Sequence, residues 1–238
     1  MQQRVLITGA NRGIGLAFVR HYLAAGAQVW AGCRQPERAQ ALAAMEAEAD
    51  GRLRRVALDV SSEASVKAAR AAVGARTGAL DLLINNAGCF APDGDGLWKQ
   101  SGEALLNVFA VNTVGPVIVT RSFADLLKGG EAPRTFSLTS GAGALGRELP
   151  PPGMQYAYPS SKAALRLMIV RMAADLQADG IIVTGMGPGY VKTDMTAGGG
   201  REPPLTPAQS VASMVKVAAS WTMAETGTFW TWEGKRSD

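Results

Sequence analysis

Short apolar runs alternate with longer segments of helical periodicity along the chain, and this alternation predicts parallel strands joined by helices. Each run expected as a strand is rich in Val, Ile or Leu, and most end near Gly, Asn, Asp or Ser. The expected strands cover residues 4–8, 28–33, 54–58, 80–84, 134–139, 181–186 and 226–232. This order indicates an α/β doubly wound parallel sheet with right-handed crossovers and helices on both faces.

Helices are expected between these runs, and prolines and hydroxyl residues mark several of their ends. They cover residues 16–25, a segment that begins at Pro36, a segment from a cap at Ser61 or Ser62 to about 73, residues 101–127 and 158–178, and a last helix from Thr206-Pro207. Gly115-Pro116 predicts a kink in the long segment 101–127, just after Asn112. Proline is tolerated only in a helix's first turn, so either a helix begins just before Pro159 or Tyr158 is not fully helical.

Composition and charge narrow the class of protein. The 238 residues are 47% hydrophobic, enough for a sizeable core, and no repeat or low-complexity linker divides them, so we expect one domain over 1–238. The 24 basic and 20 acidic side chains are scattered, which argues against binding to nucleic acid or to a membrane surface. With neither a signal-peptide pattern nor about 18 uninterrupted apolar residues, the chain is expected to be cytoplasmic.

Cysteine and histidine usage argues against metal chemistry. Cys33 and Cys89 have no metal-ligand or redox spacing and fit a reducing cytosol. The only histidine, His21, lies inside a predicted helix, where a packing or surface role is expected. We therefore expect no metal site and no histidine-based nucleophile.

A glycine-rich turn follows the first strand. Gly9, Gly13 and Gly15 form G-x-x-x-G-x-G between the strand and a helix, which differs from the G-x-G-x-x-G of the common dinucleotide fingerprint. Any tight turn between a strand and a helix can need glycine. In this context, however, the unpaired N–H groups at the helix start favour a nucleotide phosphate.

The residue after the second strand bears on which nucleotide is bound. Folds of this kind place the adenosine ribose there, and a carboxylate would bind its 2′-hydroxyl. The chain has Arg34 instead, which together with Arg12 can pair with a 2′-phosphate and favours NADP over NAD. The alternative is an exposed arginine with no ligand. Asp59, after the third strand, either accepts a hydrogen bond from adenine or simply lies in a loop.

Several motifs, taken together and in order, resemble the short-chain dehydrogenase/reductase family in its compact single-domain members. They are Thr8–Gly15, Asn85–Gly88, Asn112 within a helix, a serine that ends a strand, Tyr158-x-x-x-Lys162 and Pro188–Thr193. Within that family the closest resemblance is to sniffer-type carbonyl reductases and C-factor proteins, through Cys33-Arg34 and the residues around the last two motifs. The resemblance covers essentially the whole chain and implies a Rossmann-type fold.

The resemblance also implies hydride transfer between NADP(H) and a carbonyl or alcohol substrate. Tyr158 is the expected acid/base, because a nearby ammonium from Lys162, on the same helix face, would lower the tyrosine pKa of about 10. Tyr156 is followed four residues later by Ser160 and so lacks this cation. Ser140 is expected to orient the substrate oxygen, with Ser137 and Thr139 as alternatives. Asn112 is expected to hold a water in a proton relay to Lys162.

The cofactor-binding residues that the resemblance implies lie at the carboxyl ends of the strands. They are Gly9, Asn11, Arg12, Gly13, Ile14 and Gly15 for the phosphates, Arg34 for the 2′-phosphate, Asp59 and Val60 for adenine, Asn85, Asn86, Ala87 and Gly88 for the adenosine ribose, Pro188, Val191 and Thr193 for the carboxamide, and Tyr158 and Lys162 at the nicotinamide ribose. A monomer or homodimer without nucleic-acid or membrane partners is expected.

Other hypotheses remain open at this level. The chain could be a regulator that senses NADP without chemistry, or a methyltransferase that uses the turn for another adenosine ligand, although the latter would want an acidic residue where Arg34 stands. Substrate-site walls could come from an apolar, aromatic set that could equally be core packing: Phe90, Trp98, Met154, Tyr190 and Met195. An insertion at 147–153 borders the expected site. The short segment 193–206 suggests an open site for small or flat carbonyl compounds.

Overall fold

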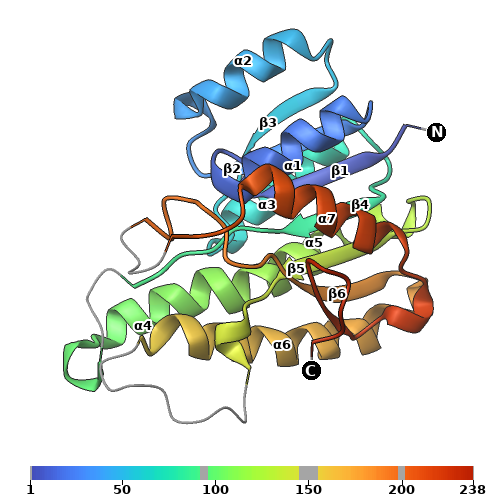
Figure 1. The fold of residues 1–238 in the computed structure, drawn as a ribbon. Helices are drawn as coiled ribbons and strands as arrows, with labels where there is room; N and C mark the ends of the chain where they lie inside the picture. Colours follow the sequence, from blue (N-terminus) through green and yellow to red (C-terminus); the bar gives the residue numbers. More distant parts are fainter. Residues whose placement is uncertain (1, 92–95, 145–154, 198–201, 238) are drawn as a thin grey trace.

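A computed structural model describes residues 2–91, 96–144, 155–197 and 202–237. Its strands are β1 (Arg4–Thr8), β2 (Gln28–Cys33), β3 (Leu53–Ala57), β4 (Leu82–Asn85), β5 (Arg134–Leu138), β6 (Ile182–Gly187) and β7 (Phe229–Thr231). They form one seven-stranded parallel sheet in the order β3-β2-β1-β4-β5-β6-β7. Helices cover both faces of the sheet (Figure 1), so the predicted fold class is confirmed.

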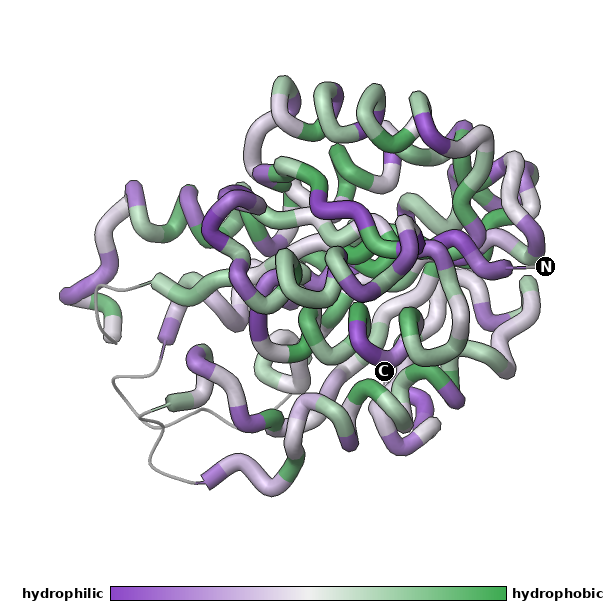
Figure 2. The backbone as a smooth tube through the Cα atoms, turned by 90° about the horizontal axis from the view of Figure 1, so that it is seen from above, coloured by the Kyte–Doolittle hydropathy of each residue, from purple (hydrophilic) through white to green (hydrophobic). Residues whose placement is uncertain are grey.

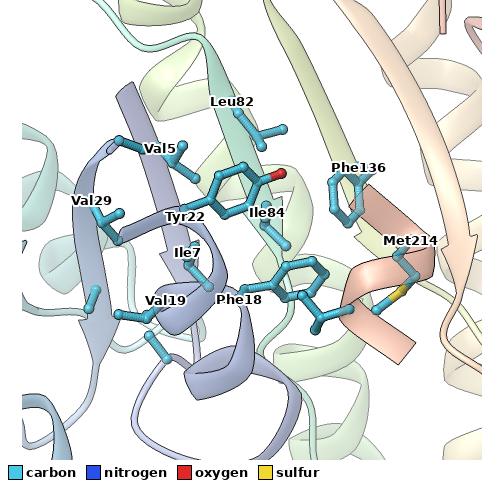
Figure 3. Packing of buried hydrophobic residues seen from close by; sticks show 14 of the residues in the cluster. Val5, Ile7, Phe18, Val19, Tyr22, Val29, Leu82, Ile84, Phe136 and Met214 are labelled. Atoms are coloured by element: carbon cyan, nitrogen blue, oxygen red, sulfur yellow. The ribbon is translucent and has the colours of Figure 1, made fainter. Parts of the chain in front are cut away.

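Two apolar layers hold the helices on the sheet. The first layer joins the sheet to α1 (Gly13–Ala24), α2 (Gln40–Glu48) and α7 (Pro207–Ala219), and the second joins it to α3 (Glu63–Gly74), α5 (Gly115–Lys128) and α6 (Ala157–Leu176). Because successive strand residues point to opposite faces, Val5 and Ile7 pack in the first layer and Leu6 in the second. Figure 3 shows Val5 beside Tyr22 and Ile7 near Phe18, two aromatic residues of α1. Hydrophobic and hydrophilic positions alternate along the helical coils (Figure 2), as expected for helices that bury one side.

Most predicted elements are confirmed, with shifted ends. The first helix begins at Gly13 rather than at residue 16, so the glycine-rich turn runs directly into the helix N-terminus. Pro36 begins only a 3-10 turn, Pro36–Arg38, before α2. Ser62 is the N-cap of α3, and its hydroxyl accepts a hydrogen bond from the Ser65 N–H. The last strand is three residues long, because a 3-10 turn and Gly227, with φ of 78°, precede it.

The long helix predicted over 101–127 is interrupted earlier than expected. It consists of α4 (Gly102–Phe109), a π-helical segment (Ala110–Val114) that contains Asn112, and α5. The break predicted at Gly115-Pro116 therefore adjoins the observed one, because the π-helical segment ends directly before Gly115 and Pro116 has no N–H to bond the carbonyl of Asn112, four residues back. By length and composition alone, residues 102–128 could span a membrane, but the apolar side chains of the α5 part, among them Val119, Phe123 and Leu127, are buried in the second layer as those of a core helix are.

Pro159 is accommodated at the start of α6. The helix begins at Ala157, with Tyr156 as its N-cap, so Pro159 lies in the first turn and Tyr158 is helical. Tyr158 and Lys162 therefore lie on the same face of α6, as their spacing predicted.

Candidate active site

Two turns at the carboxyl edge of the sheet are tied together by side chains. The Thr8 hydroxyl, at the end of β1, accepts hydrogen bonds from the backbone N–H groups of Asn86 and Ala87, both at 3.0 Å. The Asn86 side-chain amide donates to the carbonyl oxygens of Thr8 and Gly9 at 2.8 and 3.0 Å. The glycine-rich turn and the turn after β4 therefore form one rigid edge.

The glycine-rich turn forms a cradle that side chains would fill. Gly9 and Gly13 have φ of 62° and 53°, where residues with a Cβ are strained. A Cβ on Gly15 would overlap the Gly9 carbonyl oxygen and lie 2.5 Å from Asn86 Nδ2. No acidic residue lies in the first turn of α1, and no side chain caps it. The backbone N–H groups from Gly13 to Gly15 can thus accept an anion such as a diphosphate.

The two arginines expected at the cofactor lie on different sides of this cradle. Arg12 is the N-cap of α1, and its Nη1 lies 2.9 Å from Asp194 Oδ2 on the chain after β6. Arg34 is exposed just beyond β2. Burial raises the pKa of the Cys89 thiol, while the charges of Lys162 and Arg34 lower it. Arg34 therefore lies within electrostatic range of the turn after β4.

Three of the expected nucleotide contacts have side chains engaged elsewhere. The buried Asn85 amide donates to the Thr120 and Thr135 hydroxyls at 3.0 and 3.4 Å, and the Asn86 amide is bound to the glycine-rich turn. The turn after β4 therefore offers a ribose chiefly the backbone of Ala87 and Gly88. Asp59 accepts hydrogen bonds from the backbone and hydroxyl of Ser61 at 3.0 and 2.6 Å, which fits the loop alternative.

The chain brings Tyr158, Lys162 and Ser140 together. Lys162 is 5% exposed, and its Nζ lies 5.7 Å from the centre of the Tyr158 ring and donates to the Leu138 carbonyl at 2.7 Å. Ser140, half-buried just after β5, forms a side-chain hydrogen bond with Tyr158. Ser137 and Thr139, the alternatives, are buried in the sheet.

Burial dominates the acid–base properties of this pair. It raises the pKa of Tyr158, and the hydrogen bond from Ser140 opposes this effect. It also lowers the pKa of Lys162 to about 8, against the influence of the Cys89 thiol. The expectation that Lys162 lowers the pKa of Tyr158 is therefore wrong: the pKa is raised, burial has the largest effect, and the opposing influence comes from Ser140 rather than from Lys162.

Lys162→Met should reduce the increase of the free energy of unfolding with pH between about pH 8 and 10. The folded-state pKa of about 8 lies below the ordinary lysine pKa of 10.5, so the unfolded chain binds more protons in this window. The free energy of unfolding therefore rises with pH across this window, and Lys162 contributes no slope below about pH 8, where it is protonated in both the folded and the unfolded chain. Urea unfolding at several pH values measures this slope in the wild type and in the variant. Lys216→Met, at an exposed lysine of α7, should keep the wild-type slope, and a Lys162→Met slope equal to wild type would contradict the assignment.

Asn112 joins the π-helical segment to two neighbouring parts of the site. Its amide accepts from the Cys89 N–H at 2.9 Å and donates to the Cys89 carbonyl and the Ser161 hydroxyl, both at 3.0 Å. The Ser161 hydroxyl donates in turn to the Tyr158 carbonyl at 2.7 Å. Asn112 thus positions the turn after β4 and the first turn of α6. Its water relay to Lys162 stays a prediction.

The sequence analysis missed two of these positioning groups. Thr8 had a usable signal, since it is a hydroxyl residue that ends a strand directly before the glycine-rich turn. Ser161 had none, because Ser160 beside it is exposed and the two look alike in sequence. Only the packing of α6 on the π-helical segment separates them.

Of the residues expected to line the substrate site, only some lie where a wall could form. The Phe90 ring meets the Tyr158 ring edge-on, with centroids 4.4 Å apart, whereas Trp98 is 94% exposed and belongs neither to the core nor to a buried wall. Tyr190 is exposed and Met195 half-buried. Met154, the insertion 147–153 and the glycines 198–200 lie outside the described residues.

The segment expected at the carboxamide follows β6 and reaches the glycine-rich turn. The Pro188 carbonyl accepts from the Ser210 hydroxyl at 2.6 Å, and Val191 forms a bridge with Leu205. A Cβ on Gly13 would lie 3.4 Å from the Thr193 methyl group. The segment therefore spans from α7 to the start of α1.

Comparisons with known proteins agree with this geometry. Residues 3–203 match the family model described as short chain dehydrogenase. A curated relative, C-signal of Myxococcus xanthus, is 34% identical over 66% of this chain and 92% of its own length. The crystal structure of NADPH-bound carbonyl reductase from chicken fatty liver matches with a TM-score of 0.91 and 34% identity, over 99% of this chain and 98% of its own. Carbonyl reductase Sniffer of D. melanogaster matches with a TM-score of 0.88 and 25% identity, over 99% of both chains.

Proposed function

The chain belongs to the short-chain dehydrogenase/reductase family of oxidoreductases, and from this premise we propose that it interconverts a carbonyl compound and an alcohol with NADP(H). The observation that carries the proposal is the convergence of Ser140, Tyr158 and Lys162 at the carboxyl edge of the sheet, close to an anion cradle of glycines. The carbonyl reductases among its structural relatives support it.

In the proposed reaction the cofactor supplies the hydride, and this chain supplies the proton and the orientation of the substrate. Tyr158 donates its proton to the carbonyl oxygen, and the burial that raises its pKa keeps that proton in place before reduction. Ser140, already bonded to Tyr158, orients the same oxygen. Lys162 offers a buried ammonium that favours the phenolate left after transfer.

The residues that would hold the cofactor are the glycine-rich turn for the diphosphate and Arg34 for the 2′-phosphate. Arg34 is exposed beyond β2, and no acidic residue follows that strand directly. A structural relative is described as NADPH bound, which favours the same nucleotide here.

Arg34→Ala should weaken NADPH binding by about tenfold or more and leave NADH binding nearly unchanged. A guanidinium–phosphate pair is a strong charge-assisted hydrogen bond, and only NADPH carries the 2′-phosphate. Fluorescence titration of the two nucleotides gives the ratio of their dissociation constants. Arg20→Ala, at an exposed arginine of α1, should leave that ratio unchanged. An unchanged ratio in Arg34→Ala would remove its assigned role.

The deciding experiment is NADPH oxidation against a panel of ketones, aldehydes and quinones. Turnover with at least one class is expected, and cofactor binding without any turnover would contradict the proposal. In that case the second candidate, an NADP-sensing regulatory protein on the same fold, would be favoured. The similarity to a relative named C-signal supports this second candidate.

A further inference from the structure

A tight turn after β6 lies against the start of α1. It consists of residues 193–197, and we call it the docked turn. The Thr196 hydroxyl donates to the Val191 carbonyl at 2.7 Å and accepts from the Thr193 N–H at 3.0 Å, and the Ala197 N–H donates to the Thr193 carbonyl at 3.0 Å. These bonds hold the turn in one shape. In Figure 1 the orange chain between β6 and α7 passes beside the blue β1 and α1.

The docked turn touches the glycine-rich turn through one ion pair and one apolar contact. Asp194 Oδ2 lies 2.9 Å from Arg12 Nη1, and the Thr193 methyl group faces Gly13. The side chains of Arg12 and Asp194 are 66% and 72% exposed, so water screens the pair. Exposed pairs of this kind are weak and exchange readily for a stronger partner.

A phosphate held at the start of α1 would be that stronger partner. Arg12 is the N-cap of α1, beside N–H groups that suit an anion. The diphosphate as a whole and the 2′-phosphate each carry about two negative charges against one on a carboxylate, and their oxygens accept charge-assisted hydrogen bonds from a guanidinium. The carboxylate of Asp194 would also repel a phosphate that approaches Arg12.

We propose that Asp194 sets the cofactor affinity by competing with a cofactor phosphate for Arg12. Binding then exchanges the Arg12–Asp194 pair for an Arg12–phosphate pair and releases the charged contact of the docked turn. This inference rests on the proposed use of NADP(H). The phosphate concerned is either the diphosphate, present in both NADPH and NADH, or the 2′-phosphate, present only in NADPH.

Asp194→Asn tests the competition, because it removes the charge and keeps the shape. Fluorescence titration at low salt should show NADPH binding tightened by about two- to fivefold, the range set by an exposed ion pair. Equal tightening of NADH would assign the exchange to the diphosphate, and tightening of NADPH alone to the 2′-phosphate. The effect should disappear when Arg12→Gln is combined with it, and shrink in high salt.

Glu202→Gln is the matched control, since Glu202 is an exposed carboxylate paired with Lys192 on the same segment, 3.3 Å away. It should leave both dissociation constants unchanged. Unchanged or weakened NADPH binding in Asp194→Asn would overturn the competition while leaving the proposed function standing. A wild-type chain that binds neither nucleotide would overturn both.

Discussion

Tyr158→Phe should lower kcat/KM for carbonyl reduction by about a hundred- to ten-thousandfold and leave NADPH binding nearly intact. Phenylalanine keeps the ring and its edge-on contact with Phe90 but has no proton to donate. General acid catalysis contributes rate factors of this size. Initial rates with the best substrate of the panel, together with a fluorescence titration of NADPH, measure the two quantities separately.

Tyr156→Phe is the matched control. Tyr156 lies two residues earlier, is 45% exposed, and is followed four residues later by Ser160 rather than by a lysine. Its variant should retain wild-type rates. If Tyr158→Phe kept more than about a tenth of the activity, the acid would have to lie elsewhere, and the convergence of Ser140 and Lys162 on Tyr158 would have another purpose.

The sequence predicted the sheet well because its strands are buried on both faces. Runs such as residues 28–33 are apolar throughout and bounded by glycine or polar residues, so their position hardly depends on distant contacts. The last strand was overestimated because Thr226 and Gly227 precede the ladder, and the Gly227 N–H is bonded to Val183. Strand ends depend on such individual contacts, which local pattern does not contain.

The π-helical segment shows how far local rules reach. Gly115-Pro116 was the strongest helix-breaking signal, and the break ends directly before it, because Pro116 has no N–H to bond the carbonyl of Asn112. The irregularity lies at Asn112, whose amide is bound to Cys89 and Ser161, 23 and 49 residues away in sequence. The proline marks this break in the sequence, whereas the tertiary hydrogen bonds of the Asn112 side chain are not contained in any local pattern; π-helical segments are frequent at functional sites.

The candidate site also has features that the sequence predicted and features that it could not predict. Motif spacing correctly brought Tyr158 and Lys162 onto one helix face, because four residues make about one helical turn. It could not say that the Asn85 side chain turns into the core, since this depends on the hydroxyls packed against β4. The Arg12–Asp194 pair joins residues 182 positions apart, and no local pattern marks it.

Gly15→Ala should abolish useful NADPH binding, with affinity reduced by about a hundredfold or more, and should lower the free energy of unfolding by about 1–3 kcal/mol. The new methyl group would overlap the Gly9 carbonyl oxygen and crowd the Asn86 amide that holds the two turns together. The turn must then move, and the backbone N–H groups at the start of α1 lose their alignment toward the diphosphate.

Gly102→Ala is the control for this change. Gly102 also lies in the first turn of a helix, but a Cβ there would meet nothing within 4 Å. The free energy of unfolding of Gly102→Ala should therefore stay within about 0.5 kcal/mol of wild type, and its NADPH binding should be unaffected. Urea unfolding and fluorescence titration of both variants give the comparison. Wild-type affinity in Gly15→Ala would mean that the diphosphate does not depend on this turn, whereas loss of affinity at unchanged stability would place the defect in the cradle alone.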